Sequence, residues 1–363
     1  MADIKKIVLT GGPYAGKTTA LVKVMEHFSS RGFKVFTLPE VPTLFSQAGM
    51  DYLTKNKEFF YKGEVATLKM QLMLEDEFMR MAQTLHEPAV IICDRGTMDI
   101  SAYLQPEDWE KIITSQGYTE QQLRARYDAV LHLVSAADGA EEYYTTTNNK
   151  ERTEGLELAR ELDKKIIHAW TGHPHLRVIN NHRNFDNKIN RVLKEISNVL
   201  SLPQPIEEER KYIVEVTGEV PNAIECEIIQ TYLVAEPGVE ARLRRRSCDG
   251  HWLNVLTTKK PVENHEMIET DRQVSNALYE TMLRQADPYR HAIHKHRQSF
   301  IWLGQYFELD TYLDQLQGLV ILETKGVAQS ERVNFPPFLK VVADITGDQR
   351  YYNYNLALTK PGH

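Results

Sequence analysis

A glycine-rich stretch near the start of the chain has the residue types that bind phosphate. Gly11, Gly16, Lys17 and Thr18 fit the pattern G-x-x-x-x-G-K-[ST], between an apolar run and helix-like spacing. Backbone N–H groups in such a turn point inward, and the start of the helix adds partial positive charge. We therefore predict nucleotide binding by Gly11, Gly12, Pro13, Tyr14, Ala15, Gly16, Lys17, Thr18 and Thr19.

The same stretch predicts a bound cation. Lys17 is expected to reach the β- and γ-phosphates of ATP or GTP, and the Thr18 hydroxyl to bind Mg²⁺ (or Mn²⁺). Asp94 ends a second apolar run, 89–94, where a carboxylate can complete the metal shell or orient a substrate hydroxyl. Nothing in these residues selects adenine over guanine.

Three further residues are candidates for catalysis together with Asp94. Arg95 follows Asp94 and could contact a transferring phosphoryl group, or form a plain surface turn. Glu40 ends an apolar run at the same expected sheet edge, as a base, a hydroxyl ligand or a solubilising strand end. Arg152 lies on one helical face with Arg160, either above the phosphates or in a solvated helix with Glu–Arg pairs.

Charged residues alternate along five predicted strands of the second half. Because side chains two positions apart lie on one face of a strand, each alternation puts its charges on a common face. The basic members, expected to bind polyphosphate, are Lys211, Arg242, Arg244, Arg246, Lys295 and Arg297, and a family resemblance given below adds Lys259 and Lys325. The acidic members, expected as metal ligands together with Thr18 and Asp94, are Glu207, Glu209, Glu269, Asp271, Glu308 and Asp310, and the same resemblance adds Glu323.

A polar interior would explain this alternation. Like charges about 7 Å apart repel by roughly 2 kcal/mol at an effective dielectric near 20, so stacked charges require acids facing bases, or an anion and a metal between them. We predict a closed or nearly closed sheet in which Arg and Lys bind phosphates and carboxylates bind divalent cations. The alternative is an amphipathic sheet whose charged face lies in water.

The elements that position these residues differ between the two halves. Up to about residue 200, apolar runs alternate with helical periodicity, which predicts an α/β domain with a parallel sheet. Its expected strands are 4–10, 34–40, 89–94, 129–135 and 176–180, and its expected helices 17–30, 64–86, 106–115, 152–171 and 185–200. Beyond a proline-containing linker, 201–206, antiparallel strands and a helix at 275–286 predict an α+β domain. The expected domains are therefore 1–200 and 207–363.

Bulk properties narrow the class of protein. The chain has 363 residues, 42% hydrophobic and 26% charged, enough for two domains with cores of their own. Its net charge of −7 gives no reason to expect nucleic acid. No signal peptide or membrane-spanning run is evident, so we expect a cytoplasmic location. The spacing of the three cysteines suggests neither a disulfide framework nor a zinc site.

The first half resembles a known family. GGPYAGKTT, LPE, the helix with Gln71 and Glu75, ICDRGTMD and RTEGLELARELD followed by VIN are similar to an AAA-type nucleotide-binding domain. This domain is shared by NadR-type nicotinamide riboside kinases and TRPL translocation-defect proteins. The resemblance spans about residues 4–200. It implies ATP or GTP binding with Mg²⁺ on a fold that small-molecule kinases also use.

The second half resembles the CYTH, or triphosphate tunnel, family over about residues 206–345. The family's E-x-E-x-K falls on Glu207 to Lys211, its basic strand on Arg242 to Arg246, and its K-x-R on Lys295 and Arg297. Two positions depart from the family pattern, Met267 and Glu323-Thr-Lys325, and the lost carboxylate favours binding of a polyanion over its hydrolysis.

The two domains in this order, with the tail DITGDQRYYNYNLA, are most similar to TRPL proteins. We therefore expect an Mg²⁺-dependent ATP- or GTP-binding protein whose second domain binds a polyphosphate or another phosphorylated ligand. The alternatives are a small-molecule kinase or triphosphatase, and a GTP-regulated trafficking module that binds a phosphoinositide head group.

Overall fold

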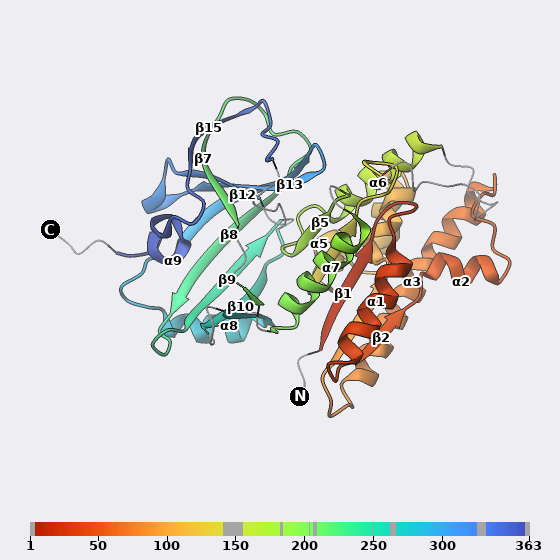
Figure 1. Cartoon of the computed structure of the whole chain (residues 1–363), viewed down its shortest axis with the longest axis horizontal. Coiled ribbons are helices and arrows are strands. Elements are labelled where there is room, and N and C mark those ends of the chain that lie inside the picture. Colours follow the sequence, from red (N-terminus) through yellow and green to blue (C-terminus); the bar gives the residue numbers. More distant parts are fainter. Residues whose placement is uncertain are drawn as a thin grey trace. The chain divides into compact units, whose positions relative to one another are not determined.

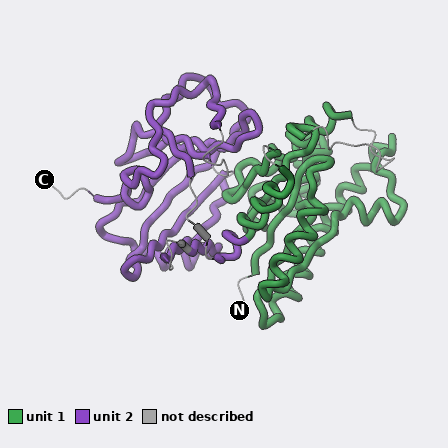
Figure 2. The backbone as a smooth tube through the Cα atoms, viewed as in Figure 1, with its two compact units in different colours: residues 1–196 green, residues 197–363 purple. Residues whose placement is uncertain are grey.

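The computed structural model describes residues 4–140, 155–181, 184–202, 204–205, 209–248, 250–261, 266–324 and 332–359. The chain forms two compact units, Met1–Ile196 (unit 1) and Ser197–His363 (unit 2), which Figure 2 distinguishes by colour. The domain boundaries expected from the sequence, 1–200 and 207–363, stay a prediction.

Unit 1, on which Figure 1 labels β1, β2 and β5, is built on a parallel five-stranded sheet. The order of its strands is β2-β3-β1-β4-β5. The strands are β1 (Lys5–Thr10), β2 (Lys34–Leu38), β3 (Ala89–Asp94), β4 (Ala129–Leu133) and β5 (Leu176–Ile179). β1, β4 and β5 are buried along their whole length, as is typical of parallel strands covered on both faces. The register pairs Leu9 with Asp94 and Thr10 with His132, so the carboxyl ends of β1, β3 and β4 meet at one edge.

Helices complete unit 1. α1 (Lys17–Ser29) buries Ala20, Val24 and Phe28, whose spacing of four puts them on one face. α3 (Lys57–Ala82) begins earlier than its periodicity indicated, because Asn56 caps it by accepting from Phe59 N at 3.1 Å. The other helices are α2 (Val41–Gln47), α4 (Pro106–Ser115), α5 (Glu120–Arg124), α6 (Leu156–Trp170), α7 (Phe185–Val199) and a 3₁₀ helix, η1 (Thr97–Tyr103).

Unit 2 is built on an antiparallel ten-stranded sheet with the order β15-β7-β14-β13-β12-β8-β9-β10-β11-β6. The strands are β6 (Gln204–Pro205), β7 (Arg210–Val216), β8 (Ile224–Leu233), β9 (Glu240–Ser247), β10 (Leu253–Pro261), β11 (Glu266–Val274), β12 (Ile293–Trp302), β13 (Gln305–Tyr312), β14 (Val320–Thr324) and β15 (Leu339–Asp344). Among the described residues, two α-helices accompany them, α8 (Asn276–Met282) and α9 (Asn353–Leu356), with three 3₁₀ helices, η4 (Leu283–Gln285), η5 (Asp314–Leu316) and η6 (Gln349–Tyr351). The predicted fold class, a parallel α/β domain followed by an antiparallel α+β domain, is confirmed.

The sheet of unit 2 is curled. Tyr232 on β8 lies within electrostatic range of Arg242 on the neighbouring β9 and of Lys211 on β7. In the sheet order, β14, β13 and β12 separate β7 from β8, so a flat sheet would hold Lys211 far from Tyr232. One face therefore turns inward and carries the alternating charges. The other face packs a separate apolar cluster that includes Phe300, Phe307, Leu309 and Leu322.

One expectation about the cysteines is wrong. Cys226 and Cys248 form a disulfide, although their sequence spacing suggested none. β8 and β9 are antiparallel with Glu227 opposite Ser247, and this register brings the next residue on each strand face to face. Residues 22 positions apart in the chain thus meet through strand pairing, which spacing alone does not reveal. Cys93 is buried in β3 and free.

Candidate functional site

The glycine-rich loop of unit 1 has the backbone of an anion site. Gly11 and Gly16 adopt φ angles of 143° and 86°, and Tyr14 between them has φ 55°. A Cβ atom on Gly11 would lie 2.1 Å from the carbonyl oxygen of Leu133, so only glycine fits. α1 starts directly after Gly16 with no side-chain cap and no acidic residue in its first turn. Its first N–H groups therefore remain available to a phosphate.

Lys17 lies over this loop. Its ammonium donates to the carbonyl oxygens of Gly11 at 3.0 Å and Gly12 at 3.4 Å. Burial, together with the neighbouring Arg95, lowers the pKa of Lys17 to about 8, although Asp94 and Glu40 oppose the shift. A ligand with phosphate charge would stabilise the protonated lysine far better than two carbonyl groups do.

Asp94 and Glu40 lie near Lys17 and Arg95, as the sequence predicted. Burial raises the pKa of Asp94 despite the nearby Lys17, and its Oδ1 is buried with no hydrogen-bond partner among the described residues. Burial also acts on Glu40, but Arg95 and Lys17 outweigh it and lower the pKa of this carboxyl. Thr18 is exposed at the start of α1. The carboxylate oxygen and the hydroxyl fit the oxygen ligands that Mg²⁺ prefers.

Arg95 is held by an ion-pair network that the sequence did not indicate. Its backbone is left-handed, with φ 69°, and its N–H donates to the Leu9 carbonyl at 3.0 Å. Its guanidinium forms ion pairs with Glu40 and, at 3.5 Å, with Asp99. Asp99 in turn accepts from Gly96 N at 2.9 Å and from Trp170 Nε1 at 3.1 Å. These bonds fix the orientation of the Arg95 guanidinium beside the loop.

Asp163 on α6 supports the loop from behind. It accepts from Gly12 N at 2.6 Å and contacts His132 Nε2 at 3.1 Å. A Cβ atom on Gly12 would lie 2.7 Å from Asp163 Oδ1, which explains the second glycine of the loop. The sequence showed Asp163 only as one aspartate on a predicted helix. The contact between Asp163 and Gly12 depends on the fold, so the sequence did not reveal it.

Glu64 on α3 is a second residue that the sequence analysis missed. Its side chain is buried at 4% exposure, and burial alone raises its pKa to about 7. Glu64 and Glu40 both act on the pKa of Tyr52, whose hydroxyl hydrogen-bonds Thr67 at 2.9 Å. Polar residues at the helical spacing 64, 67, 71 and 75 on one buried face were the available signal.

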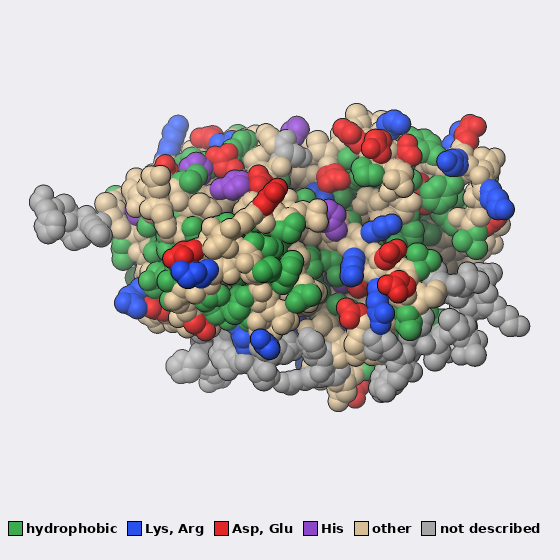
Figure 3. Space-filling model, turned by 90° about the horizontal axis from the view of Figure 1, so that it is seen from above, with side chains coloured by type: hydrophobic (Ala, Val, Ile, Leu, Met, Phe, Trp, Pro, Cys, Tyr) green, Lys and Arg blue, Asp and Glu red, His purple; other side chains and the backbone are tan. Residues whose placement is uncertain are grey.

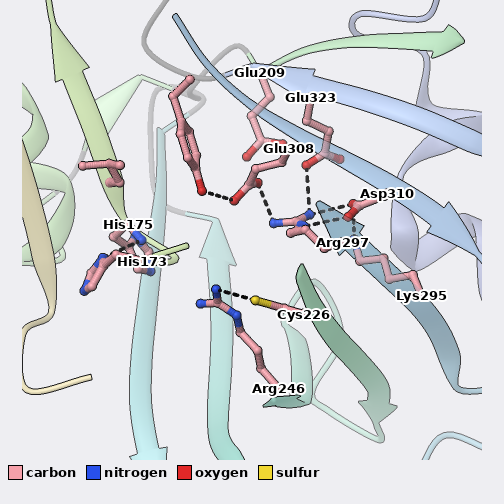
Figure 4. A network of polar contacts seen from close by, with 12 residues as sticks. His173, His175, Glu209, Cys226, Arg246, Lys295, Arg297, Glu308, Asp310 and Glu323 are labelled. Atoms are coloured by element: carbon pink, nitrogen blue, oxygen red, sulfur yellow. Dashed lines mark hydrogen bonds and ion pairs between the residues drawn. The ribbon is translucent and has the colours of Figure 1, made fainter. Parts of the chain in front are cut away.

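In unit 2, the predicted basic and acidic residues meet on the inward face (Figure 4). Arg297 on β12 points between three carboxylates, bonding Asp310 at 2.6 Å, Glu308 at 2.5 Å and Glu323 at 3.4 Å. Lys295 shares Asp310 at 2.5 Å. Burial opposes ionisation of Asp310, but Arg297 and Lys295 outweigh it and lower the pKa of this carboxyl strongly.

The remaining charges pair in the same way. Ion pairs join Lys211 to Glu323 (2.8 Å) and Glu209 (3.1 Å), Arg242 to Glu269 (3.3 Å), Arg244 to Asp271 (3.7 Å) and Lys259 to Glu269 (3.1 Å). Arg246 donates to Cys226 Sγ at 3.1 Å, and burial lowers its pKa to about 10. On the inward face of the sheet, acidic side chains therefore lie opposite basic ones. The roles of these residues in ligand binding stay predictions.

A metal centre in unit 2 does not follow from this arrangement. Within the described ranges, no group of three or more His, Cys, Asp or Glu side chains is placed to hold a metal ion. The expected carboxylate ligands that the structure describes pair with arginine or lysine, and their role as metal ligands stays a prediction. Three expected site residues, Arg152, Glu207 and Lys325, lie outside the described residues.

On the face drawn in Figure 3, basic and acidic side chains of the described residues are interspersed, without an extended basic patch. Among the helices that the structure describes, none combines the length and the apolar character needed to cross a membrane.

Comparison with known families assigns the first unit. A sequence model of the AAA domain family matches residues 6–188, just over half of the chain. The chain belongs to this AAA domain family. The finer resemblances, to NadR-type kinases and TRPL proteins, stay predictions. No curated protein matches the chain.

Solved structures resemble part of the chain. The hypothetical protein NE1496 is 26% identical, with 43% of this chain and 100% of that chain covered and a TM-score of 0.34. The inorganic triphosphatase NE1496 is 26% identical over 44% and 99%, with a TM-score of 0.34. The PH1819 protein from Pyrococcus horikoshii OT3 is 18% identical over 34% and 80%, with a TM-score of 0.26. TM-scores this low carry no functional argument.

Proposed function

We propose that unit 1 binds a Mg²⁺–nucleoside triphosphate, with ATP and GTP as the candidates. The observation that carries this proposal is the buried Oδ1 of Asp94, which lacks a hydrogen-bond partner among the described residues and lies near Lys17. A buried carboxylate oxygen of this kind needs a cation or a donor. Thr18 and Asp94 would hold Mg²⁺, which would neutralise the phosphate charge, while Lys17 and the start of α1 bind the phosphates.

Titration calorimetry with MgATP and MgGTP tests this proposal. Lys17→Ala should weaken binding by about ten- to a hundredfold, because a charge-assisted contact contributes roughly 1.5–3 kcal/mol. Lys23→Ala is a matched control, since Lys23 lies on the same helix with its side chain 53% exposed. Equal affinities of the two variants would contradict the phosphate-loop assignment.

The ion pairs of Arg95 favour phosphoryl transfer as the reaction of this site. Arg95 and Glu40 form an ion pair near Lys17, so a cation and a base candidate lie near the expected γ-phosphate. Asp94→Asn should retain nucleotide affinity within about tenfold yet suppress turnover, since it removes charge from the metal side. Nucleotide turnover equal to that of the wild type would show that Asp94 has no catalytic role. Absence of turnover in both proteins would favour a nucleotide-dependent switch.

For unit 2, we propose binding of a triphosphate or a similar phosphate chain on the inward face. Six basic side chains of that face, all paired with carboxylates, support the proposal: Lys211, Arg242, Arg244, Lys259, Lys295 and Arg297. An incoming polyanion would replace carboxylates as the partner of these cations. Because the described carboxylates of this face pair with cations, and because no group of three or more metal-binding side chains comes together among the described residues, we propose binding of the phosphate chain and not its metal-dependent hydrolysis.

Thermal unfolding with inorganic tripolyphosphate tests the second unit. Ligand that binds only the native state raises the melting temperature, and this shift should persist in Lys17→Ala. Arg244→Ala should reduce it. Arg245→Ala is the matched control, because Arg245 is the next residue but stacks over Trp252 at 5.1 Å. A shift that disappears in Lys17→Ala would place the anion in the phosphate loop and overturn this proposal.

A further inference from the structure

The disulfide of unit 2 lies on the charged inward face. Cys226 on β8 and Cys248, directly after β9, continue the alternation of the inward-facing residues on their strands, and Cys226 is 1% exposed. Strand pairing places Cys226 opposite Arg297 of β12, and Arg297 opposite Asp310 of β13. The disulfide therefore belongs to the same row of side chains as the buried ion pairs.

Arg246 connects the disulfide to the cations of this face. Its guanidinium donates to Cys226 Sγ at 3.1 Å (Figure 4). It also lies within electrostatic range of Arg244, Arg297 and Glu308. Burial lowers the pKa of Arg246 to about 10, so an anionic partner would stabilise its charged form. A sulfur atom in a disulfide carries no charge and is a weak acceptor, whereas phosphate and thiolate are strong ones.

The two sulfur atoms differ in accessibility. Cys226 is buried, whereas Cys248 is partly exposed, so an external thiolate can attack the disulfide at Cys248. The electron pair of the S–S bond then leaves with Cys226 Sγ as a thiolate, next to the guanidinium of Arg246. A disulfide is cleaved faster when the leaving thiolate is stabilised. The position of Arg246 therefore favours reduction of this bond.

Cations also favour the thiolate form of Cys226 after reduction. Arg246 on β9 donates to the sulfur, and Arg297 on β12 lies opposite Cys226 in the register. Glu308 on β13 opposes them, but its charge is already paired with Arg297 at 2.5 Å. Neighbouring cations lower the pKa of a thiol, so the reduced sulfur would become a charged partner of Arg246.

We propose that Cys226–Cys248 is a redox-active disulfide, and that its reduction weakens phosphate binding on the inward face because Arg246 gains a thiolate partner. The effect on binding rests on the proposed function of unit 2, whereas the reduction itself does not.

A dithiol supplies both electrons for this reduction. Its first sulfur forms a mixed disulfide with Cys248 and expels the Cys226 thiolate. Its second sulfur then attacks the mixed disulfide, which releases Cys248 and oxidises the dithiol to a cyclic disulfide. One of the two protons of the dithiol passes to Cys248 and the other to solvent, so Cys226 stays a thiolate.

Dithiothreitol tests the redox activity of the full chain under native conditions. After quenching and unfolding, alkylation should modify Cys93 alone in the untreated protein, and Cys226 and Cys248 as well in the treated one. Cys93 is the internal control, because its thiol is free in both forms. A disulfide that stays intact in the treated protein overturns the proposal.

Calorimetry with tripolyphosphate tests the effect on binding. In the Lys17→Ala protein, which removes the phosphate-loop contribution, the oxidised form should bind about tenfold more tightly than the reduced form. The reason is that reduction sets a charge-assisted contact of Arg246 in competition with the ligand. Equal affinities of the two forms overturn this part of the proposal.

Two serine variants separate the thiolate from the loss of the cross-link. Both lack the disulfide, but Cys248→Ser keeps the Cys226 sulfur and Cys226→Ser does not. Cys248→Ser should bind tripolyphosphate as weakly as the reduced protein, and Cys226→Ser within about threefold of the oxidised protein. The ultraviolet absorbance of thiolate should also be larger in Cys248→Ser, which reports the ionisation of Cys226 without any ligand. Equally weak binding by both variants would overturn the role of the thiolate.

The remaining outcomes are distinguishable. Absence of tripolyphosphate binding in both the oxidised and the reduced protein overturns the proposed function of unit 2 and the effect on binding. Alkylation and thiolate absorbance still decide the redox activity in that case. If a serine variant fails to fold, the comparison of the oxidised with the reduced protein decides the effect on binding.

Discussion

The two proposed phosphate sites hold their cations in different ways. In unit 1, the acceptors that Lys17 finds among the described residues are backbone carbonyl groups, and its pKa is lowered to about 8. In unit 2, Arg297 is surrounded by three carboxylates, and its pKa is raised despite burial. A cation without a carboxylate partner is ready to bind phosphate, whereas a paired cation must first exchange its partner.

The two sites also differ in backbone conformation. The loop of unit 1 uses left-handed residues, Gly11, Tyr14, Gly16 and later Arg95, so its geometry depends on unusual local conformations. The site of unit 2 uses regular strands, in which every second side chain faces inward. We therefore expect substitutions in unit 2 to act on stability and ligand binding together, and substitutions of Lys17 to act on ligand binding alone.

The largest expected effect is on the stability of unit 2. Arg297→Ala leaves Asp310, Glu308 and Glu323 with fewer cations in a buried site, which should lower the free energy of unfolding by about 3–5 kcal/mol. Lys17→Ala should change it by less than about 1 kcal/mol, because no carboxylate in the described part of the chain forms an ion pair with Lys17. Urea unfolding followed by circular dichroism measures both. Similar losses in the two variants would remove the contrast between the sites.

Two carboxylate variants, one in each unit, should change the stability of the protein in opposite directions. The pKa of Glu64 is about 7 in the folded protein, above its ordinary value of 4.5, so its stabilising effect is complete below about pH 4.5 and is lost as the pH rises through 7. At pH 8, Glu64→Gln should therefore stabilise the protein by roughly 2 kcal/mol. Glu323→Gln should destabilise it, because Lys211 and Arg297 lose a partner.

Thermal unfolding between pH 5 and pH 8 measures this difference. The gain of Glu64→Gln over the wild type should grow with pH, while Glu323→Gln should be less stable throughout. A Glu64→Gln variant that is less stable than the wild type at pH 8 would indicate a stabilising partner for the carboxylate and contradict the prediction.

The smallest expected effect is the pH dependence of nucleotide binding. Since the pKa of Lys17 is about 8, the unbound protein carries a largely neutral lysine at pH 9. Affinity for MgATP should therefore fall about tenfold between pH 7 and pH 9. Lys17→Arg, which stays protonated, should show a much smaller decrease. Identical pH profiles would show that the titration of Lys17 does not control binding.

Much of the fold was predictable because it depends on short-range patterns. The five strands of unit 1 and the charged strands of unit 2 follow from apolar runs and alternate charges. Short or terminal elements were missed, among them α2, α5 and β15, whose few residues carry little periodicity. The start of α3 was missed because a cap at Asn56, not an apolar face, sets it.

The sequence by itself determined the phosphate loop, since Gly11, Gly16 and Lys17 act through local backbone geometry. It also determined which faces of the strands in unit 2 carry charge, because the side-chain period is fixed by the strand. Only the tertiary structure decided which residues from distant segments meet. Asp163 reaches Gly12, Glu64 lies buried near Tyr52, and Cys226 pairs with Cys248. These contacts depend on strand register and packing, which no local pattern encodes.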